Sequence, residues 1–238
     1  MQEEVERALG VVLSEPEPPR LTVAGRTDTG VHALGQVASY EHEAVDPRAL
    51  NSLLPADVAV LDCNPAPDGF DARRDATSRA YVYRVLARPA RSALLAGRVL
   101  HWPHAVDFAA LEQCAATLVG EHDFTAFTPT ETDHVRFCRL VYAAFWRRAS
   151  VGDAAVLEFW IEADAFMRHM NRVLVGTMLE VAGGRRTPAS FAELLAGRPR
   201  AEAGPTAPAH GPYLAGVGYG GERVLETPDG LRTARPAG

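Results

Sequence analysis

Lysine is absent from this chain of 238 residues, and all 24 residues in the Lys and Arg class are arginine. With 30 acidic residues the formal net charge is -6, which argues against broad electrostatic binding to nucleic acid, because phosphate binding normally draws on a basic field. An RNA ligand would have to meet a local basic patch. Arginine suits such a patch, since its planar guanidinium binds phosphate and stacks on unpaired bases, although a GC-rich genome is the simpler explanation of the composition.

Cysteine is scarce as well. The three cysteines, Cys63, Cys114 and Cys138, are far apart, odd in number and without metal-ligand spacing. We expect free thiols in a reducing cytoplasm and no metal site. His101 and His104 are separated by Trp102 and Pro103, with no carboxylate or thiol ligand nearby, so this segment is expected to be a loop and not a zinc site.

Long apolar runs are also missing, since none approaches the ~18 residues of a membrane helix. The first residues are charged and amphipathic, which predicts no signal peptide. The chain is nevertheless 47% hydrophobic, enough for a buried core in one larger domain or two small lobes. The polar, glycine-rich tail after residue 220 is expected to be loosely ordered.

Hydrophobic periodicity and turn residues predict a chain that mixes helices and strands. Helices are expected at residues 2–13, 46–54, 108–118, 166–181 and 188–195. Strands are expected at residues 21–24, 36–40, 58–61, 79–86, 140–147, 154–163 and 212–219, with a polar loop over 121–137. The proline-containing segment at residues 102–104 is the best boundary between two halves.

One short turn at residues 24–32 contains an arginine, a carboxylate and two glycines, in the order Ala-Gly-Arg-Thr-Asp-Thr-Gly-Val-His. Extended segments flank it, so Asp28 is expected on a tight connection from which it can face another molecule. An ordinary turn with a surface salt bridge to Arg26 would explain the same letters. The triplet Asp-Thr-Gly also occurs in aspartic proteases, but those enzymes need an apolar strand before the aspartate and a second triplet, and this chain has neither.

The same residues, followed by Gly35-Gln36-Val37, closely resemble the signature loop of the tRNA pseudouridine synthase A (TruA) family. The resemblance implies that Asp28 is the catalytic nucleophile. It also implies that Arg26 helps to flip the target uridine out of its stack and to hold the aspartate.

A second motif lies in the predicted strand at 79–86, where alternation places Arg79, Tyr81, Tyr83 and Val85 on one face. Its Ala-Thr-x-Arg-x-Tyr-x-Tyr pattern resembles the family's tyrosine motif, which gives Tyr81 the part of the tyrosine that stacks on the uracil and assists proton transfer. Cross-strand packing is the commoner fate of a strand tyrosine and accounts for Tyr83. Phosphate contacts are expected from Arg79 and its neighbours Arg73, Arg74, Arg84, Arg88, Arg91 and Arg98.

The third motif lies on the predicted helix at 166–181, which is apolar around most of its circumference. Arg172 in that helix needs a carboxylate, because a buried unpaired guanidinium is costly. Asp28 is the natural partner, and the alternative is that Arg172 reaches solvent at the helix rim. Phe-Met-x-His-Met-x-Arg resembles the family's third motif, whose arginine pairs with the nucleophile, although Asn171 stands where the family more often has valine. In the same way, Leu214 is implied to line the uracil pocket.

The resemblance implies an α+β fold of two ferredoxin-like (RRM-like) halves, residues 1–104 and 105–238, with a mostly antiparallel sheet, helices on one side and a central active-site cleft. It implies a cytoplasmic homodimer that isomerises uridine to pseudouridine at positions 38 to 40 of the tRNA anticodon stem-loop. An isomerisation needs no cofactor and no metal. Whether Asp28 adds to the sugar carbon or starts an elimination is left open by the residues.

Family members begin with a further strand and a Tyr-Asp-Gly to Gly-Trp-Gln segment, which this sequence does not show before its first predicted helix. A misplaced start codon and a truncated or divergent member explain this equally. Two rival functions therefore stand beside the synthase. One is an RNA-binding relative with impaired catalysis, and the more distant one is an aspartic protease.

Overall fold

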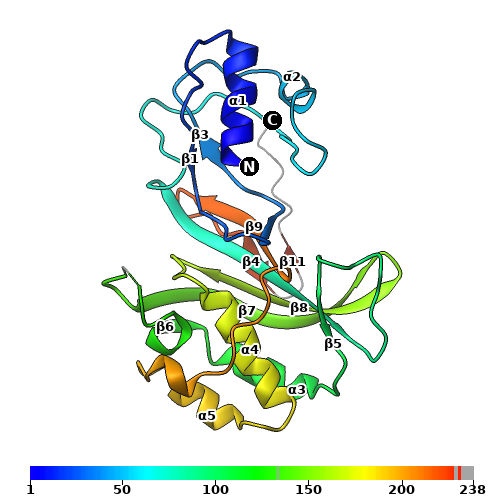
Figure 1. Ribbon diagram of the computed structural model, residues 1–238. Helices are drawn as coiled ribbons and strands as arrows, with labels where there is room; N and C mark the ends of the chain where they lie inside the picture. The colour runs from blue at the N-terminus through cyan, green and yellow to red at the C-terminus, as the bar shows by residue number, and fades with distance from the viewer. Residues whose placement is uncertain (133, 228–229, 232–238) are drawn as a thin grey trace. The chain divides into compact units, whose positions relative to one another are not determined.

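The computed structural model of the protein describes residues 1–132, 134–227 and 230–231 (Figure 1). Close contacts divide the chain into two compact units. The first unit takes in residues 1–26 and 37–76, and the second takes in residues 27–36 and the described residues from 77 onward. The halves expected at residues 1–104 and 105–238 are defined by a fold that repeats within the chain, whereas these units are defined by close contacts. The halves therefore remain a prediction.

The first unit is a small helical and extended cluster. Its helix α1, Gln2–Leu13, has the predicted bounds, and strands β1, Thr22–Val23, and β3, Ala38–Ser39, pair antiparallel. Helix α2, Pro47–Asn51, is shorter than predicted but begins as expected, with the Asp46 carboxylate accepting a hydrogen bond from the Arg48 backbone N–H. Four buried side chains form its core: Ala8, Leu9, Leu21 and Leu50.

The strand predicted at residues 58–61 is wrong, because these residues form no strand. The backbone N–H and C=O of Val60 bond to the side-chain amide of Asn51, each at 2.8 Å. An amide side chain here takes the two bonds that a neighbouring strand would have made. Because these backbone groups are already bonded to Asn51, the apolar residues at 58–61 do not join a sheet.

The second unit is built on a seven-stranded sheet with the order β2-β9-β4-β8-β7-β6, and β5 pairs with β4 outside this path. Pairing is antiparallel for β4 with β8, β8 with β7 and β7 with β6, and parallel for β2 with β9 and β4 with β5. The strands are β2 His32–Ala33, β4 Ala76–Ala87, β5 Leu100–Trp102, β6 Gly120–Asp123, β7 Cys138–Val151, β8 Ala154–Ala163 and β9 Pro212–Tyr219. The predicted α+β class with a mostly antiparallel sheet is confirmed.

Helices α3, α4 and α5 lie together against one face of this sheet (Figure 1). They span Phe108–Ala116, Met170–Ala182 and Pro188–Glu193, and two short 3-10 turns, Thr125–Phe127 and Arg200–Glu202, complete the layer. Ten of the 13 residues of α4 are buried, as its apolar circumference predicted. No helix of the described residues is long and apolar enough to cross a membrane.

Strand β4 alternates as its sequence predicted. Tyr81, Tyr83 and Val85 pack into the core beneath the helices. Ala80 and Val82 point to the opposite face, where they meet side chains of β8 and β9. The strand is therefore buried on both sides, and it carries the tyrosine motif to the helical face of the sheet.

Strands β5 and β6 lie where loops were expected. Strand β6 lies at the start of the predicted loop 121–137, and its sequence Gly-Glu-His-Asp has no apolar alternation from which a strand could be predicted. It forms because β7 extends far enough to pair with it, and the buried Phe124 follows it directly. Strand β5 ends at Trp102, inside the segment proposed as a boundary, and pairs with β4.

The segment after residue 220, expected to be loosely ordered, contains strands β10, Leu225–Thr227, and β11, Gly230–Leu231, which pair antiparallel. Residues 228–229 and 232–238 of that tail lie outside the described residues. Glu162 on β8 is completely buried and accepts hydrogen bonds from the Ser78 hydroxyl and from the backbone N–H groups of Val224 and Leu225. This carboxylate ties the start of the tail to the sheet.

We expect Glu162→Gln to lower the free energy of unfolding by about 2 kcal/mol, because an amide nitrogen would face a donor that the carboxylate now satisfies. The measurement is urea unfolding at neutral pH. Glu121→Gln, an exposed substitution on β6, is the matched control and should change stability by less than about 0.5 kcal/mol. Equal effects from the two variants would contradict a tie through Glu162.

Candidate active site

Asp28 lies on a tight turn that leads into β2. The Val31 backbone N–H bonds to the Asp28 carbonyl at 3.0 Å, and Gly30 takes φ 88°, a value that favours glycine. Just after β2, Gly35 lies so close to β9 that a Cβ there would come within 2.8 Å of the Ala215 carbonyl oxygen. The turn is therefore anchored on β9, while the Asp28 side chain remains 43% exposed.

Arg172, in the first turn of α4, lies against this carboxylate. Its Nη1 is 3.7 Å from Asp28 Oδ2, and its Nε donates a hydrogen bond of 2.7 Å to the Ala207 carbonyl. The Arg172 side chain is only 18% exposed and lies against Asp28, so the alternative in which it reaches out to solvent does not hold.

His169 is a third member of the site that the sequence reading quoted within a motif but to which it gave no role. Its Nε2 is 3.3 Å from the same Asp28 Oδ2, and its side chain is 22% exposed. Burial and the nearby Arg172 lower the pKa of His169, and Asp28 opposes them. The signal in the sequence was its spacing, since residues three apart at a helix start lie on one side.

Tyr81 reaches the site from β4. Its ring packs edge-on against Phe166, with ring centroids 4.9 Å apart. Burial raises the pKa of Tyr81 to about 12; the charge of Arg79 acts in the opposite direction, and that of Asp28 adds to the rise. Tyr81 therefore stays protonated at neutral pH and lies within electrostatic range of the carboxylate.

The other predicted site residues are placed differently. Leu214 on β9 is completely buried, and its carbonyl accepts bonds from the N–H groups of Leu34 and Gly35, so it supports the turn from beneath. Arg79 is partly buried and donates a bond to the Asp164 carbonyl at 3.3 Å. Arg26 is exposed and belongs to the first unit, and its part in the site remains a prediction.

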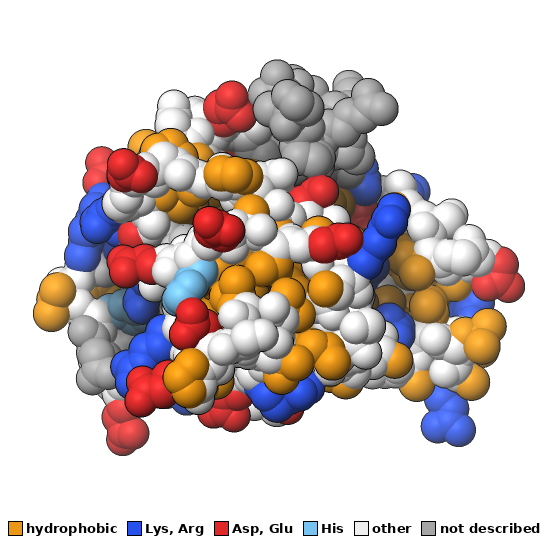
Figure 2. Space-filling model, turned by 90° about the horizontal axis from the view of Figure 1, so that it is seen from above, with side chains coloured by type: hydrophobic (Ala, Val, Ile, Leu, Met, Phe, Trp, Pro, Cys, Tyr) orange, Lys and Arg blue, Asp and Glu red, His pale blue; other side chains and the backbone are white. Residues whose placement is uncertain are grey.

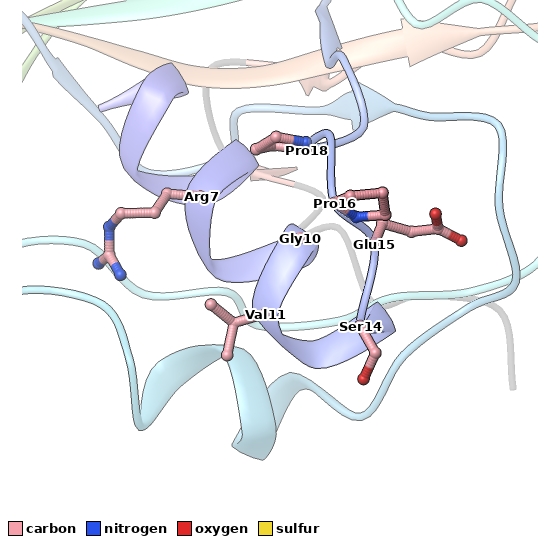
Figure 3. A pocket seen from close by; sticks show the side chains of 7 residues that line it. All are labelled: Arg7, Gly10, Val11, Ser14, Glu15, Pro16 and Pro18. Atoms are coloured by element: carbon pink, nitrogen blue, oxygen red, sulfur yellow. The ribbon is translucent and has the colours of Figure 1, made fainter.

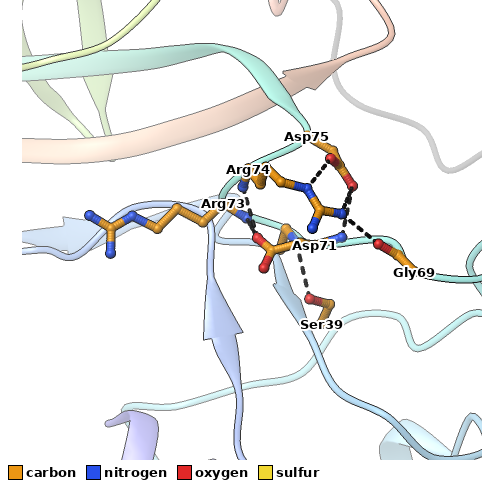
Figure 4. A network of polar contacts seen from close by, with 7 residues as sticks. Ser39, Gly69, Asp71, Arg73, Arg74 and Asp75 are labelled. Carbon is orange, nitrogen blue, oxygen red and sulfur yellow. Dashed lines mark hydrogen bonds and ion pairs between the residues drawn. The ribbon is translucent and has the colours of Figure 1, made fainter.

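Two arginines expected to bind phosphate are held by the protein itself. Arg74 bonds to Asp75 and to the Gly69 carbonyl, and the side-chain hydrogen bond from Arg74 lowers the pKa of Asp75 (Figure 4). Arg84 forms an ion pair with the buried Glu158 at 3.0 Å. On the face shown in Figure 2, acidic and basic side chains are interspersed. Net charge thus gives little guidance to where RNA would bind.

The first unit carries a pocket of about 380 Å³ beside α1 (Figure 3). Its lining includes the charged residues Arg7 and Glu15, with the helix glycine Gly10 and two prolines, Pro16 and Pro18. Among the described residues, no aromatic ring and no pair of carboxylates lines this pocket. The residues around Asp28 remain the stronger candidate for chemistry.

Known proteins resemble this chain along most of its length. A family model described as tRNA pseudouridine synthase matches residues 114–220, which include Arg172 and Leu214. A protein of Chromobacterium violaceum named tRNA pseudouridine synthase A is 40% identical over 94% of this chain and 86% of its own length. Proteins of the same name from Methylococcus capsulatus and Bacillus pumilus are 42% and 35% identical, covering 92% of this chain and 80% and 89% of their own.

The contacts of His169 predict how its pKa responds to its neighbours. Because burial and Arg172 lower this pKa, Arg172→Met should raise it, and because Asp28 opposes them, Asp28→Asn should lower it further. An NMR titration of the imidazole resonances measures each value, with exposed His42 as the internal control. The pKa of His169 in the folded protein lies below the ordinary value of ~6.5. The free energy of unfolding that neutral His169 contributes is therefore fully present above pH ~6.5, and it is lost as the pH falls through the pKa of the folded protein. A His169 pKa that is unchanged in both variants would contradict the contacts.

Proposed function

The chain belongs to the tRNA pseudouridine synthase A family, and from this premise we propose that it isomerises uridine to pseudouridine in the anticodon stem-loop of tRNA, with Asp28 as the nucleophile. The observation that carries the proposal is the position of the Asp28 carboxylate, within 3.7 Å of the Arg172 guanidinium and within electrostatic range of Tyr81. An ionised, oriented carboxylate beside a ring is what the reaction needs.

The reaction breaks the bond between N1 of uracil and the sugar carbon and joins C5 of the same base to that carbon. The proton on C5 is lost and N1 gains one, so no atom and no electron is exchanged overall. A carboxylate can serve as it does in covalent glycosidases, provided that it stays ionised. Asp28 either adds to the sugar carbon or starts an elimination from it, and both routes begin from the same charged residue.

The base must leave its stack before it can react. Tyr81, on the helical face of β4, offers a ring on which a flipped uracil can stack, and its protonated hydroxyl can take part in proton transfer. Arg26 is proposed to fill the space that the base vacates, and Arg79 to contact the backbone beside it. These roles are assigned by the motifs that the residues occupy.

Membership of the family removes the protease alternative. The protease would need a second aspartate beside Asp28, whereas the described contacts of this carboxylate are with an arginine and a histidine. The remaining alternative is an RNA-binding relative with impaired catalysis. We further propose positions 38 to 40 as the targets, a homodimer as the working form, the cytoplasm as the location, and no metal or cofactor.

Asp28→Asn should lower the rate of pseudouridine formation at least about 10³-fold, because the reaction loses its nucleophile while the fold keeps an isosteric side chain. The measurement is pseudouridine content of anticodon-arm transcripts after incubation with each protein, including transcripts in which each uridine is replaced in turn. Retained binding with no product in the wild type would support the impaired relative. Product from Asp28→Asn at the wild-type rate would remove Asp28 from the mechanism.

Tyr81→Leu should weaken productive binding by about 10- to 100-fold, since a base stacked on an aromatic ring gains about 1 to 3 kcal/mol. Tyr81→Phe keeps the ring and should retain binding, so any loss of kcat in it reports the hydroxyl. Tyr83→Phe, on the same face of β4, is the matched control, because the Tyr83 hydroxyl bonds to the Pro208 carbonyl inside the protein. Steady-state kinetics on the transcript measures all three. Equal KM values for the Leu and Phe variants would refute stacking.

A further inference from the structure

His169 has a backbone conformation that is unusual for a residue with a side chain. It takes φ 61° and ψ 0° at the N-cap of α4, where the chain normally has extended angles. Its carbonyl accepts the bond from Val173 N–H at 3.0 Å and so begins the helix, but its side chain makes no capping bond. A left-handed residue of this kind persists only where its surroundings hold it, and such residues cluster at functional sites.

The consequence of this conformation is where the imidazole lies. Nε2 is 3.3 Å from Asp28 Oδ2, and Arg172 Nη1 is 3.7 Å from the same oxygen. The closest approach of each side chain is to the same oxygen, Oδ2. Two polar side chains beside one oxygen restrict the carboxylate more than one does, which is how a reacting group is held in position.

The charges around the ring favour a neutral imidazole. Asp28 faces it from the β2 turn, Arg168 and Arg172 from the start of α4, and Arg200 from the second 3-10 turn. Burial and the three guanidiniums oppose a positive charge on the ring, whereas the Asp28 carboxylate favours one. A neutral imidazole carries one N–H, and that proton must be on Nε2 for the contact with Asp28 to be a hydrogen bond.

We propose that His169 is a positioning residue for the nucleophile: its Nε2–H donates to Asp28 Oδ2 and, with Arg172, holds the carboxylate in place for the substrate. A neutral donor orients the carboxylate without adding a second full cation beside it, which would make the oxygen less nucleophilic. The inference rests on the proposed function for its kinetic consequence, but the contact between His169 and Asp28 is a property of the free protein.

The sharpest variants are His169→Gln and His169→Met. Both side chains are unbranched at Cβ and similar in length, so both meet the same backbone strain at φ 61°, and only Gln ends in an N–H that can reach where Nε2 lies. We expect Gln to keep kcat within about threefold and Met to lose about 10- to 100-fold in kcat, the range of a hydrogen bond to a charged group. KM should stay within about threefold in both, with thermal unfolding midpoints equal between them.

The outcomes separate a positioning role from a structural one. Equal kcat for Gln and Met overturns the proposal, whether both are active or both are impaired. A loss confined to KM also overturns it, because a misaligned nucleophile slows the chemical step and leaves binding intact. Asp28→Asn is assayed beside them. If this variant stays active, or if the wild type forms no pseudouridine, the proposed function fails. In that case the kcat values of the His169 variants say nothing about the role of His169.

A second measurement then decides the matter without catalysis. The ¹⁵N resonances of the His169 ring in the wild-type protein at pH 7.5, assigned by their loss in His169→Gln, report which nitrogen carries the proton. We expect the Nε2–H tautomer, and its population should fall in Asp28→Asn, whose amide can turn either an oxygen or an N–H toward the ring. A protonated Nδ1 with a bare Nε2 would overturn the hydrogen bond and the proposal with it.

Discussion

A guanidinium in a buried helix needs a carboxylate, and this requirement organises the second unit around Asp28. Arg172 belongs to a helix whose other side chains are mostly apolar and buried. Its Nε is satisfied by the Ala207 carbonyl, which leaves the outer nitrogens to face the only carboxylate that the described contacts assign to it. An unpaired charge at that depth would be costly. The Asp28 turn must therefore lie beside Arg172 for α4 to pack, and the chemistry needs the same position.

The start of α4 adds a second stabilising effect. The first backbone N–H groups of a helix have no partner within the helix and give that end a partial positive charge. Asp28 contacts the side chain of His169, the residue that precedes the first turn, so its carboxylate lies near this end of the helix. The Asp28 carboxylate therefore has two polar neighbours from this end of the helix, the His169 ring and the Arg172 side chain.

Much of this arrangement follows from the sequence, and the exceptions have physical reasons. Apolar circumference predicted a buried α4, and a buried Arg172 predicted a partner at Asp28. The helix begins four residues later than its apolar pattern suggested, because His169 leaves the helical region of backbone angles. The spacing of apolar residues carries no information about which residue has left-handed backbone angles. Strand β6 and the segment around Val60 were predicted wrongly because a strand forms only where another segment of the chain lies close enough to pair with it. A local sequence pattern carries no information about that distant segment.

The acidic side chains of the second unit show what distinguishes a reactive carboxylate from a structural one. Glu158 and Glu162 lie on β8 and are both almost completely buried. Glu158 accepts bonds from two arginines and the Trp160 N–H, and both oxygens of Glu162 are engaged by neutral donors. Neither has an oxygen left for another molecule. Asp28 is held by Arg172 and His169 and is still 43% exposed, so it is ordered by the fold and available to react, which is the combination that a nucleophile requires.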